Sequence, residues 1–205
     1  TLTSAAQTAV TVTLSNGATL IIAAGATSGS TSVGAPGDDP YVDASTVDAT
    51  ISTATGGNFE SLQIDPAAAS TSVSDDVDAT MVSLSATASV AEGGSIVYTA
   101  TLSNAAQAPV TVTLSSGETI AIAAGATSGS VSILAPADDV YIDGSTVSRT
   151  ISSASGGNFE SLLVNPAAAA TTVTDTIDTT TVSITGDAAV AEGATAAYTV
   201  SLTSA

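Results

Sequence analysis

The sequence predicts an all-β protein made of tandem β-sandwich domains, and two observations carry this prediction. Short stretches of alternating apolar and polar residues recur along the chain, for example VTVTL at 110–114, and such alternation is typical of strands with one buried face. No stretch keeps the spacing of an amphipathic helix. Whole phrases also recur at an offset of 100 residues, such as GGNFESL at 56–62 and 156–162, and a period this long indicates repeated domains rather than a solenoid.

The repeat divides the chain into three segments. Residues 79–178 form a complete repeat, residues 1–78 match its last four-fifths, and residues 179–205 match its first fifth. The first segment therefore lacks two strands, and the last supplies a spare pair. Either the chain is an arbitrary segment of a longer run of tandem repeats, or neighbouring molecules complete each other by donated strands.

Seven strands are expected in the complete repeat, at 82–85, 96–102, 110–114, 119–122, 130–133, 146–151 and 171–174. Seven short strands in about 100 residues fit an immunoglobulin-like Greek-key sandwich. Alternation predicts the inward-facing side chains Val82, Leu84, Tyr98, Leu102, Val112, Ile122, Val131, Ile133, Val147 and Ile151. The segment FESLLVNP at 159–166 could be a short extra strand or a packed loop. We predict tandem seven-stranded sandwiches of this kind, arranged end to end.

The composition excludes several classes of function. Nineteen acidic residues against a single basic one, Arg149, give a formal net charge of −18, which disfavours nucleic acid and anionic membrane surfaces as partners. Cysteine and histidine are absent, so disulfides, a Ser–His–Asp triad and zinc sites built on these residues are excluded. Aromatic residues are only 3%. A small domain with so few large apolar side chains in its core needs an additional stabilising element, and the one available here is a metal ion held by oxygen ligands.

A ten-residue acidic loop occurs twice, as APGDDPYVDA at 35–44 and APADDVYIDG at 135–144. Each copy has an adjacent pair of aspartates and a third aspartate four positions later: Asp38, Asp39 and Asp43, then Asp138, Asp139 and Asp143. Carboxylates this close repel one another, and a hard cation or bulk water relieves the repulsion. Aspartate is also a common turn former, so a solvated surface loop is the alternative.

The order of the strands favours a cation site over a solvated surface loop. In a sandwich of alternating strand directions, the loops after the first, third and fifth strands lie at the same end as the end of the seventh strand. Seven of the eight acidic residues of the complete repeat fall there, namely Glu92, Glu118, Asp138, Asp139, Asp143, Asp175 and Asp178. We predict a Ca2+ site at this end, because calcium accepts six to eight oxygen ligands in a tolerant geometry.

The boundaries between repeats are a second candidate. The linkers SDDVDAT at 74–80 and TDTIDTT at 174–180 carry Asp75, Asp76 and Asp78, and Asp175 and Asp178. An ion bound from both sides would stiffen the joint, whereas a flexible polar linker is the alternative. Glu60 and Glu160, expected in a loop that faces the preceding domain, are further candidate ligands.

The chain also resembles a known family. VAEGGSIVYTATLSN at 90–104, PVTVTLSSG at 109–117, IAAGATSGSVSI at 122–133, DDVYID at 138–143 and TVTDTID at 172–178 are similar to Calx-β sandwiches. They resemble still more the calcium-binding extender repeats of type-I-secreted RTX adhesins, including those of an Antarctic ice-binding adhesin. The resemblance implies that Glu92, Asp138, Asp139, Asp143, Asp175 and Asp178 hold calcium. Here Asp143 replaces the family's usual Glu.

We therefore expect a non-enzymatic, extracellular spacer on a bacterial cell surface. Its repeats, stiffened by Ca2+, would project a distal adhesive domain, and its partners would be neighbouring repeats rather than a small-molecule substrate. A carbohydrate-binding module is the alternative, with Tyr41 and Tyr141 as its candidate aromatic contacts. An enzyme using paired carboxylates would need a cleft and a raised pKa.

Overall fold

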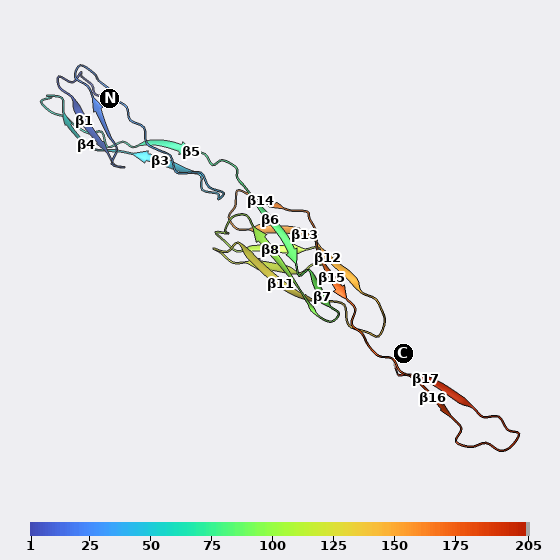
Figure 1. Cartoon of the computed structure of the whole chain (residues 1–205). Helices are drawn as coiled ribbons and strands as arrows, with labels where there is room; N and C mark the ends of the chain where they lie inside the picture. The colour runs from blue at the N-terminus through green and yellow to red at the C-terminus, as the bar shows by residue number, and fades with distance from the viewer. Residues whose placement is uncertain (204–205) are drawn as a thin grey trace. The chain divides into compact units, whose positions relative to one another are not determined.

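The computed structural model describes residues 1–203, and all their regular secondary structure is β (Figure 1). The prediction of an all-β chain of immunoglobulin-like type is confirmed. The chain divides into two compact units, Thr1–Asp78 and Ala79–Ala205, called unit 1 and unit 2. Residues 1–203 contain no helix of the length and hydropathy needed to cross a membrane.

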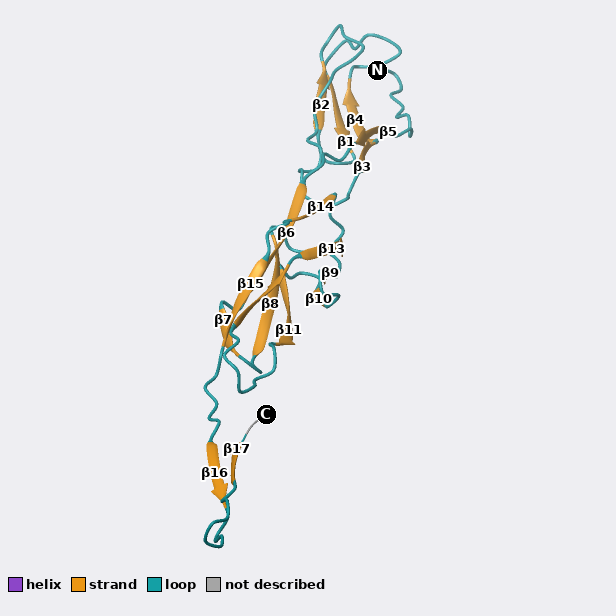
Figure 2. Ribbon diagram, turned by 90° about the vertical axis from the view of Figure 1, so that its right-hand side faces the viewer, coloured by secondary structure: helices purple, strands orange, loops and turns teal. Residues whose placement is uncertain are grey.

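Residues 79–174 of unit 2 form three sheets (Figure 2). The first has the order β11-β8-β6-β14 and consists of Ser128–Leu134, Ser95–Leu102, Ala79–Ala86 and Ser161–Val164. The second has the order β10-β9-β13 and consists of Thr119–Ile122, Val110–Leu114 and Ile151–Gly156. The third has the order β12-β15-β7 and consists of Ser145–Arg149, Ala169–Thr174 and Ser89–Ala91. The remaining strands, β16 (Val182–Gly186) and β17 (Tyr198–Leu202), pair with each other.

Three local features differ from the predicted strands. The prediction of one strand at 146–151 is wrong, because the chain breaks at Thr150 into β12 and β13, which join different sheets. Thr150 instead exchanges hydrogen bonds with Ser115, and a register shift follows at Ile151, which is how a bulge redirects a strand. The ambiguous segment 159–166 contains a strand, β14, parallel to β6. Strand β7, parallel to β15, was not predicted.

The core of unit 2 follows the predicted alternation. Val82, Tyr98, Leu102, Val112, Ile122 and Ile151 are buried as predicted. The predicted inward residues Leu84, Val131, Ile133 and Val147 are only half-buried; the last three lie on β11 and β12, the edge strands of their sheets. Phe159 closes one end of the core. A Cβ atom added at Gly157, where φ is +88°, would lie 2.2 Å from the Phe159 ring, so this contact requires glycine.

Unit 1 repeats only part of this architecture. One sheet has the order β2-β1-β4, built from Thr19–Ile22, Val10–Leu14 and Ile51–Gly56, and a second pairs β3 (Ser45–Ala49) with β5 (Ala69–Val73). Its registers match those of unit 2, since Val10 lies opposite Ile22 as Val110 lies opposite Ile122. The segments 28–34 and 61–64, which correspond in sequence to β11 and β14, are not strands.

Candidate metal centre

Glu92 lies in the turn between β7 and β8, and two backbone hydrogen bonds hold this turn. The Glu92 N–H donates to the carbonyl of Thr174, at the end of β15, over 3.0 Å. The Gly93 N–H donates to the carbonyl of Pro136, in the acidic loop, over 2.6 Å. The turn is therefore fixed between the end of β15 and the start of the acidic loop 135–144.

Asp143 and Asp175 reach the same place from two paired strands. Asp143 comes just before β12, and Asp175 directly follows β15. These strands are antiparallel, with Ser145 opposite Val173, so the start of one and the end of the other lie together. Three segments far apart in sequence thus converge at one end of unit 2.

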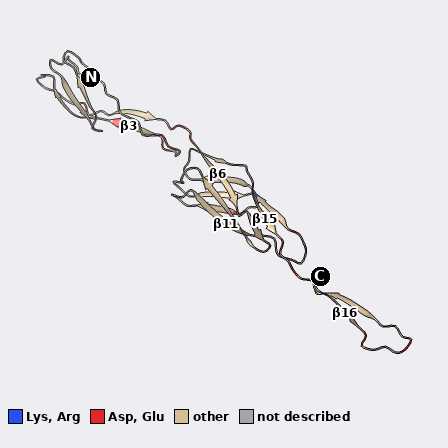
Figure 3. Cartoon of the chain, viewed as in Figure 1, with Lys and Arg blue, Asp and Glu red and all other residues tan. Residues whose placement is uncertain are grey.

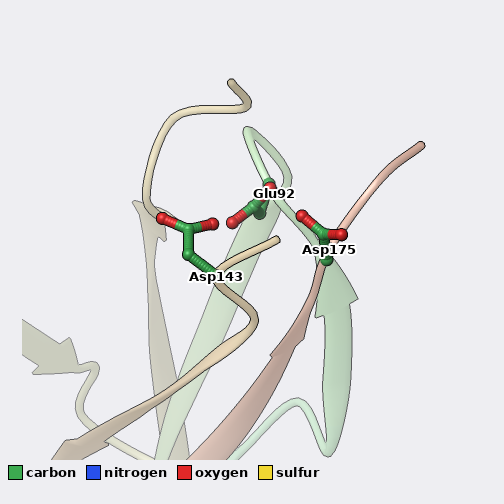
Figure 4. A group of neighbouring side chains, drawn as sticks. All are labelled: Glu92, Asp143 and Asp175. Atoms are coloured by element: carbon green, nitrogen blue, oxygen red, sulfur yellow. The ribbon is translucent and has the colours of Figure 1, made fainter. Parts of the chain in front are cut away.

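The three carboxylates turn toward one centre (Figure 4). One oxygen from each of Glu92, Asp143 and Asp175 lies within 4.8 Å of the others. Glu92 is only 7% exposed, and its Oε2 atom is buried without a hydrogen-bond partner among the described residues. The Oδ1 atom of Asp175 is likewise buried and unpaired there. Buried acceptors of this kind are costly unless a proton or a cation satisfies them.

The raised pKa of Glu92 also indicates that the group favours a bound proton or cation. Hydrogen bonding to the Asp143 carboxyl, burial and the negative charges of Asp143, Asp175 and Asp138 together raise the pKa of Glu92 to about 7. When Glu92 carries its proton, it can donate this proton to the Asp143 carboxylate. A divalent cation in the same position would replace that proton and leave Glu92 ionised.

The other predicted ligands of unit 2 lie in different settings. Asp138 is close enough for its charge to affect the pKa of Glu92, and it accepts a hydrogen bond from the Thr176 hydroxyl. Asp139 uses Oδ1 to accept the Tyr141 N–H over 2.8 Å, which makes it a turn former. Asp178 lies outside the group of three. Tyr141, a candidate carbohydrate contact, is exposed.

Glu160 and Glu118 also lie outside the group of three carboxylates. Glu160 precedes β14, whose start pairs with the start of β6, so it belongs to the opposite end of the sandwich. Glu118 accepts a hydrogen bond from the Ser116 hydroxyl, and this bond, a backbone bond and the positive charge of Arg149 lower its pKa.

Unit 1 gathers the corresponding aspartates. Asp38, Asp43, Asp75 and Asp76 line an open pocket of about 280 Å³. Asp75 accepts the backbone N–H of Asp43 over 3.3 Å, and Asp39 accepts that of Tyr41 over 2.9 Å. Partial desolvation, then the charges of Asp78, Asp76, Asp75 and Asp39, raise the pKa of Asp38. Partial desolvation and its acidic neighbours, Asp39 first, also raise the pKa of Asp43.

The position equivalent to Glu92 is missing from residues 1–78, and Glu60 lies between β4 and residues 61–64.

The donor set is one that a hard cation prefers. All three groups in unit 2 offer carboxylate oxygens, and the chain lacks histidine and cysteine, the usual nitrogen and sulfur ligands of metal ions in proteins. Calcium favours such oxygens and tolerates irregular geometry. Acidic residues are otherwise excluded from the strands: of the nineteen, only Asp48 lies within one (Figure 3). The residues present therefore fit a calcium ion.

Sequence reasoning named all three members of the group but missed the element that aligns them. Strand β7 pairs in parallel with β15, placing Ala91 opposite Thr174, and this pairing sets Glu92 beside Asp175. The segment is only three residues long, so its alternation gives no signal. Glu192, the copy of Glu92 in the VAEG phrase at 190–193, was not among the predicted ligands.

Comparison with known proteins identifies the family. The model of the LapA domain matches residues 1–76 and again residues 78–176. No curated protein and no solved structure matches the chain. The LapA domain is a domain of large adhesins, which indicates a cell-surface or extracellular location. Because the two matches cover most of the chain and coincide with its internal repeat, this chain belongs to the LapA domain family.

Proposed function

We propose that this chain is part of the extender region of a bacterial surface adhesin and that its repeats bind Ca2+ to become stable and stiff. The extender holds a distal adhesive domain away from the cell for attachment to surfaces or in biofilms. The convergence of the Glu92 carboxylate with those of Asp143 and Asp175 (Figure 4), together with the buried, unpaired Oε2 atom of Glu92, is the observation that carries the calcium part of the proposal.

The proposed action of calcium is linked to folding. An ion that binds only the folded state stabilises it by RT ln(1 + [L]/Kd), which is about 2.7 kcal/mol at a hundredfold excess over Kd. Extracellular calcium modules commonly bind at roughly 10⁻⁴–10⁻³ M. Repeats with such affinities would remain loose in a low-calcium cytoplasm and tighten after export.

Stiffening would follow from the position of the ion. Asp175 is the first residue after β15, so it lies where the chain leaves the sandwich. A calcium ion bridging Asp175 to Glu92 and Asp143 would fix the direction of the departing segment. This is the feature that an extender needs, because a polar linker without such an anchor is flexible.

Calcium titration of the whole chain tests the proposal. We expect saturable binding by calorimetry and a melting temperature for unit 2 that rises by roughly 10–20 °C at a hundredfold excess of calcium. Glu92→Gln should abolish most of this rise, because it removes the central charge at nearly constant volume. Glu118→Gln, outside the group, should leave it unchanged. A calcium-induced rise of equal size in the wild-type chain and in Glu92→Gln would contradict the assignment.

A further inference from the structure

Strand β11 has one free edge. It ends the four-stranded sheet of unit 2, where it pairs with β8 on one side, and no strand of residues 1–203 pairs with its other side (Figure 2). The Thr127 carbonyl accepts the Leu102 N–H just before the strand, and along an antiparallel pair the residues bonded to the neighbour alternate with those that are not. The backbone N–H and C=O groups directed away from β8 therefore belong to Ser128, Ser130, Ser132 and Leu134. Such a row of unpaired groups is a template for another strand.

This edge lacks the features that usually protect an exposed strand, which are charges, proline, bulges and short length. Strand β11 is seven residues long and keeps one register with β8. It has no proline, and no charged residue lies between Glu118 and Asp138. The other edges of the three sheets differ: β7, β10 and β14 have only three or four residues, β12 ends on Arg149, and a register shift interrupts the pairing of β13.

The side chains of β11 are also incompletely covered. Val131 and Ile133 are only half-buried, and Leu134 is 80% exposed. Strand β10 approaches β11 from the core side, since a Cβ atom added at Gly129 would lie 2.2 Å from the Ala121 carbonyl oxygen. A further strand beside β11 would thus bury apolar surface as well as satisfy backbone groups.

We propose that β11 of one copy of this chain pairs antiparallel with β11 of a second copy, which joins their two four-stranded sheets into one. With Val131 opposite its own counterpart, Ser130 lies opposite Ser132 and Ser128 lies opposite Leu134. This register pairs every residue of β11 whose backbone groups face the free edge. The contact is isologous, with a two-fold axis at Val131, so it closes as a dimer.

The charge distribution favours a second copy in this orientation. Strand β11 leads directly into the acidic loop 135–144, whereas residues 123–127 on its other side carry no charge. Antiparallel pairing places the acidic loop of each copy beside the uncharged segment of the other, so the two loops lie at opposite ends of the joined strands. Parallel pairing would bring both acidic loops together and is disfavoured by their repulsion. A basic partner would be attracted to the acidic loop rather than to this neutral edge.

Sedimentation of the full chain tests the pairing. In saturating calcium and moderate salt, which screens the repulsion between copies, the wild type should form a dimer of twice 19.5 kDa as its concentration rises. Ser130→Asp combined with Ser132→Asp puts like charges opposite each other across the contact and should abolish the dimer. Ser130→Asp combined with Ser132→Lys changes the same two exposed positions but puts opposite charges together, so it should retain the dimer.

The outcomes of this comparison decide the proposal. A wild-type chain that stays monomeric at millimolar concentration, or equal dimerisation of the two double variants, would overturn it. The melts that test the calcium site use dilute, monomeric protein, so either proposal can fail without the other.

Disulfide formation tests the register. The chain has no cysteine, so chains carrying only Ser130→Cys are mixed with chains carrying only Ser132→Cys and oxidised. Opposed residues in a hydrogen-bonded antiparallel pair have Cα atoms about 5.5 Å apart, within the range of a disulfide. The mixed dimer should therefore greatly exceed the half share expected from random collision. A random ratio, or an excess of either symmetric dimer, would overturn the register.

The antiparallel orientation has a consequence for cell attachment, which rests on the function proposed above. Extenders that project from two facing cells run in opposite directions, so their repeats can pair through β11 and join the cells. Beads that carry the full chain attached by one end should aggregate in calcium, and beads carrying the Ser130→Asp, Ser132→Asp variant should stay dispersed. Wild-type beads that stay dispersed while the free chain dimerises would overturn the joining of cells and leave the pairing itself intact.

Discussion

Glu92 shows how the stability of a fold can depend on the protonation or ion pairing of a single carboxylate. Its turn is fixed by backbone hydrogen bonds from two directions, which place its side chain beside those of Asp143 and Asp175. The folded protein must therefore bring a third negative group to Asp143 and Asp175. Burying a charge this way is unfavourable unless it is paired, so we expect a proton or a cation at Glu92 to stabilise the turn.

This arrangement predicts an unusual pH dependence for the calcium-free chain. The pKa of Glu92 is raised from 4.5 to about 7 on folding, so protonation stabilises the folded state fully below 4.5 and is lost as the pH rises through about 7. In chelator, unit 2 should melt at a higher temperature at about pH 6 than at about pH 8, a range in which ordinary carboxyls do not titrate.

Thermal melts of Glu92→Gln provide the matched control for this pH effect. The glutamine cannot ionise, so the difference in melting temperature between about pH 6 and about pH 8 should disappear. In saturating calcium the wild-type trend should reverse, because protons then compete with the ion. A pH effect that persists undiminished in Glu92→Gln would assign it to other groups.

At the scale of elements, the two units show that a strand forms only where its partner exists. The segments GSVSIL at 129–134 and GSTSVG at 29–34 differ little in their pattern of small and β-branched residues, yet only the first belongs to a strand, β11. The difference is the presence of β8 beside it. Strand formation here depends on hydrogen bonding and burial, with little contribution from local propensity.

Hydrogen exchange should reveal this dependence within one molecule. In the wild-type chain at low concentration, amides in residues 28–34 and 61–64 should exchange much faster than those in β11 and β14, because they lack a ladder partner. Amides of β1 and β9, which are paired in both units, serve as the internal reference. Equal protection of 28–34 and β11 would show that this segment forms a strand without a partner equivalent to β8.

The same logic explains what the sequence could and could not predict. Alternation located the strands that contribute to the core, such as β8 and β9, because burial imposes a period of two residues. It could not locate β7, which is too short to show a period and is defined by its parallel pairing with β15. Strand order correctly brought Glu92, Asp143 and Asp175 to one end, but which acids share a centre depends on register and turn geometry. Asp139 shows this, since its carboxylate is used locally by Tyr141.

At the scale of the whole molecule, the formal charge of −18 affects stability in a way that can be confused with ion binding. Any salt screens repulsion among nineteen acidic residues, so sodium chloride should also stabilise the calcium-free chain. Screening acts over the whole surface and needs high ionic strength. The proposed coordination of calcium by Glu92, Asp143 and Asp175 would be local and should saturate at a much lower concentration of calcium.

The two effects should separate in a single set of melts. In chelator, raising sodium chloride from about 0.05 to about 0.5 M should increase the melting temperatures of the wild-type chain and of Glu92→Gln by similar amounts. At about 0.5 M sodium chloride, millimolar calcium should still raise the melting temperature of unit 2 in the wild type, whereas Glu92→Gln should gain little. Magnesium at the same concentration controls for divalent screening, since it requires a stricter octahedral geometry and releases its waters reluctantly. If sodium chloride abolishes the calcium effect, or magnesium reproduces it in full, the acidic end of unit 2 is a screened surface rather than a calcium site.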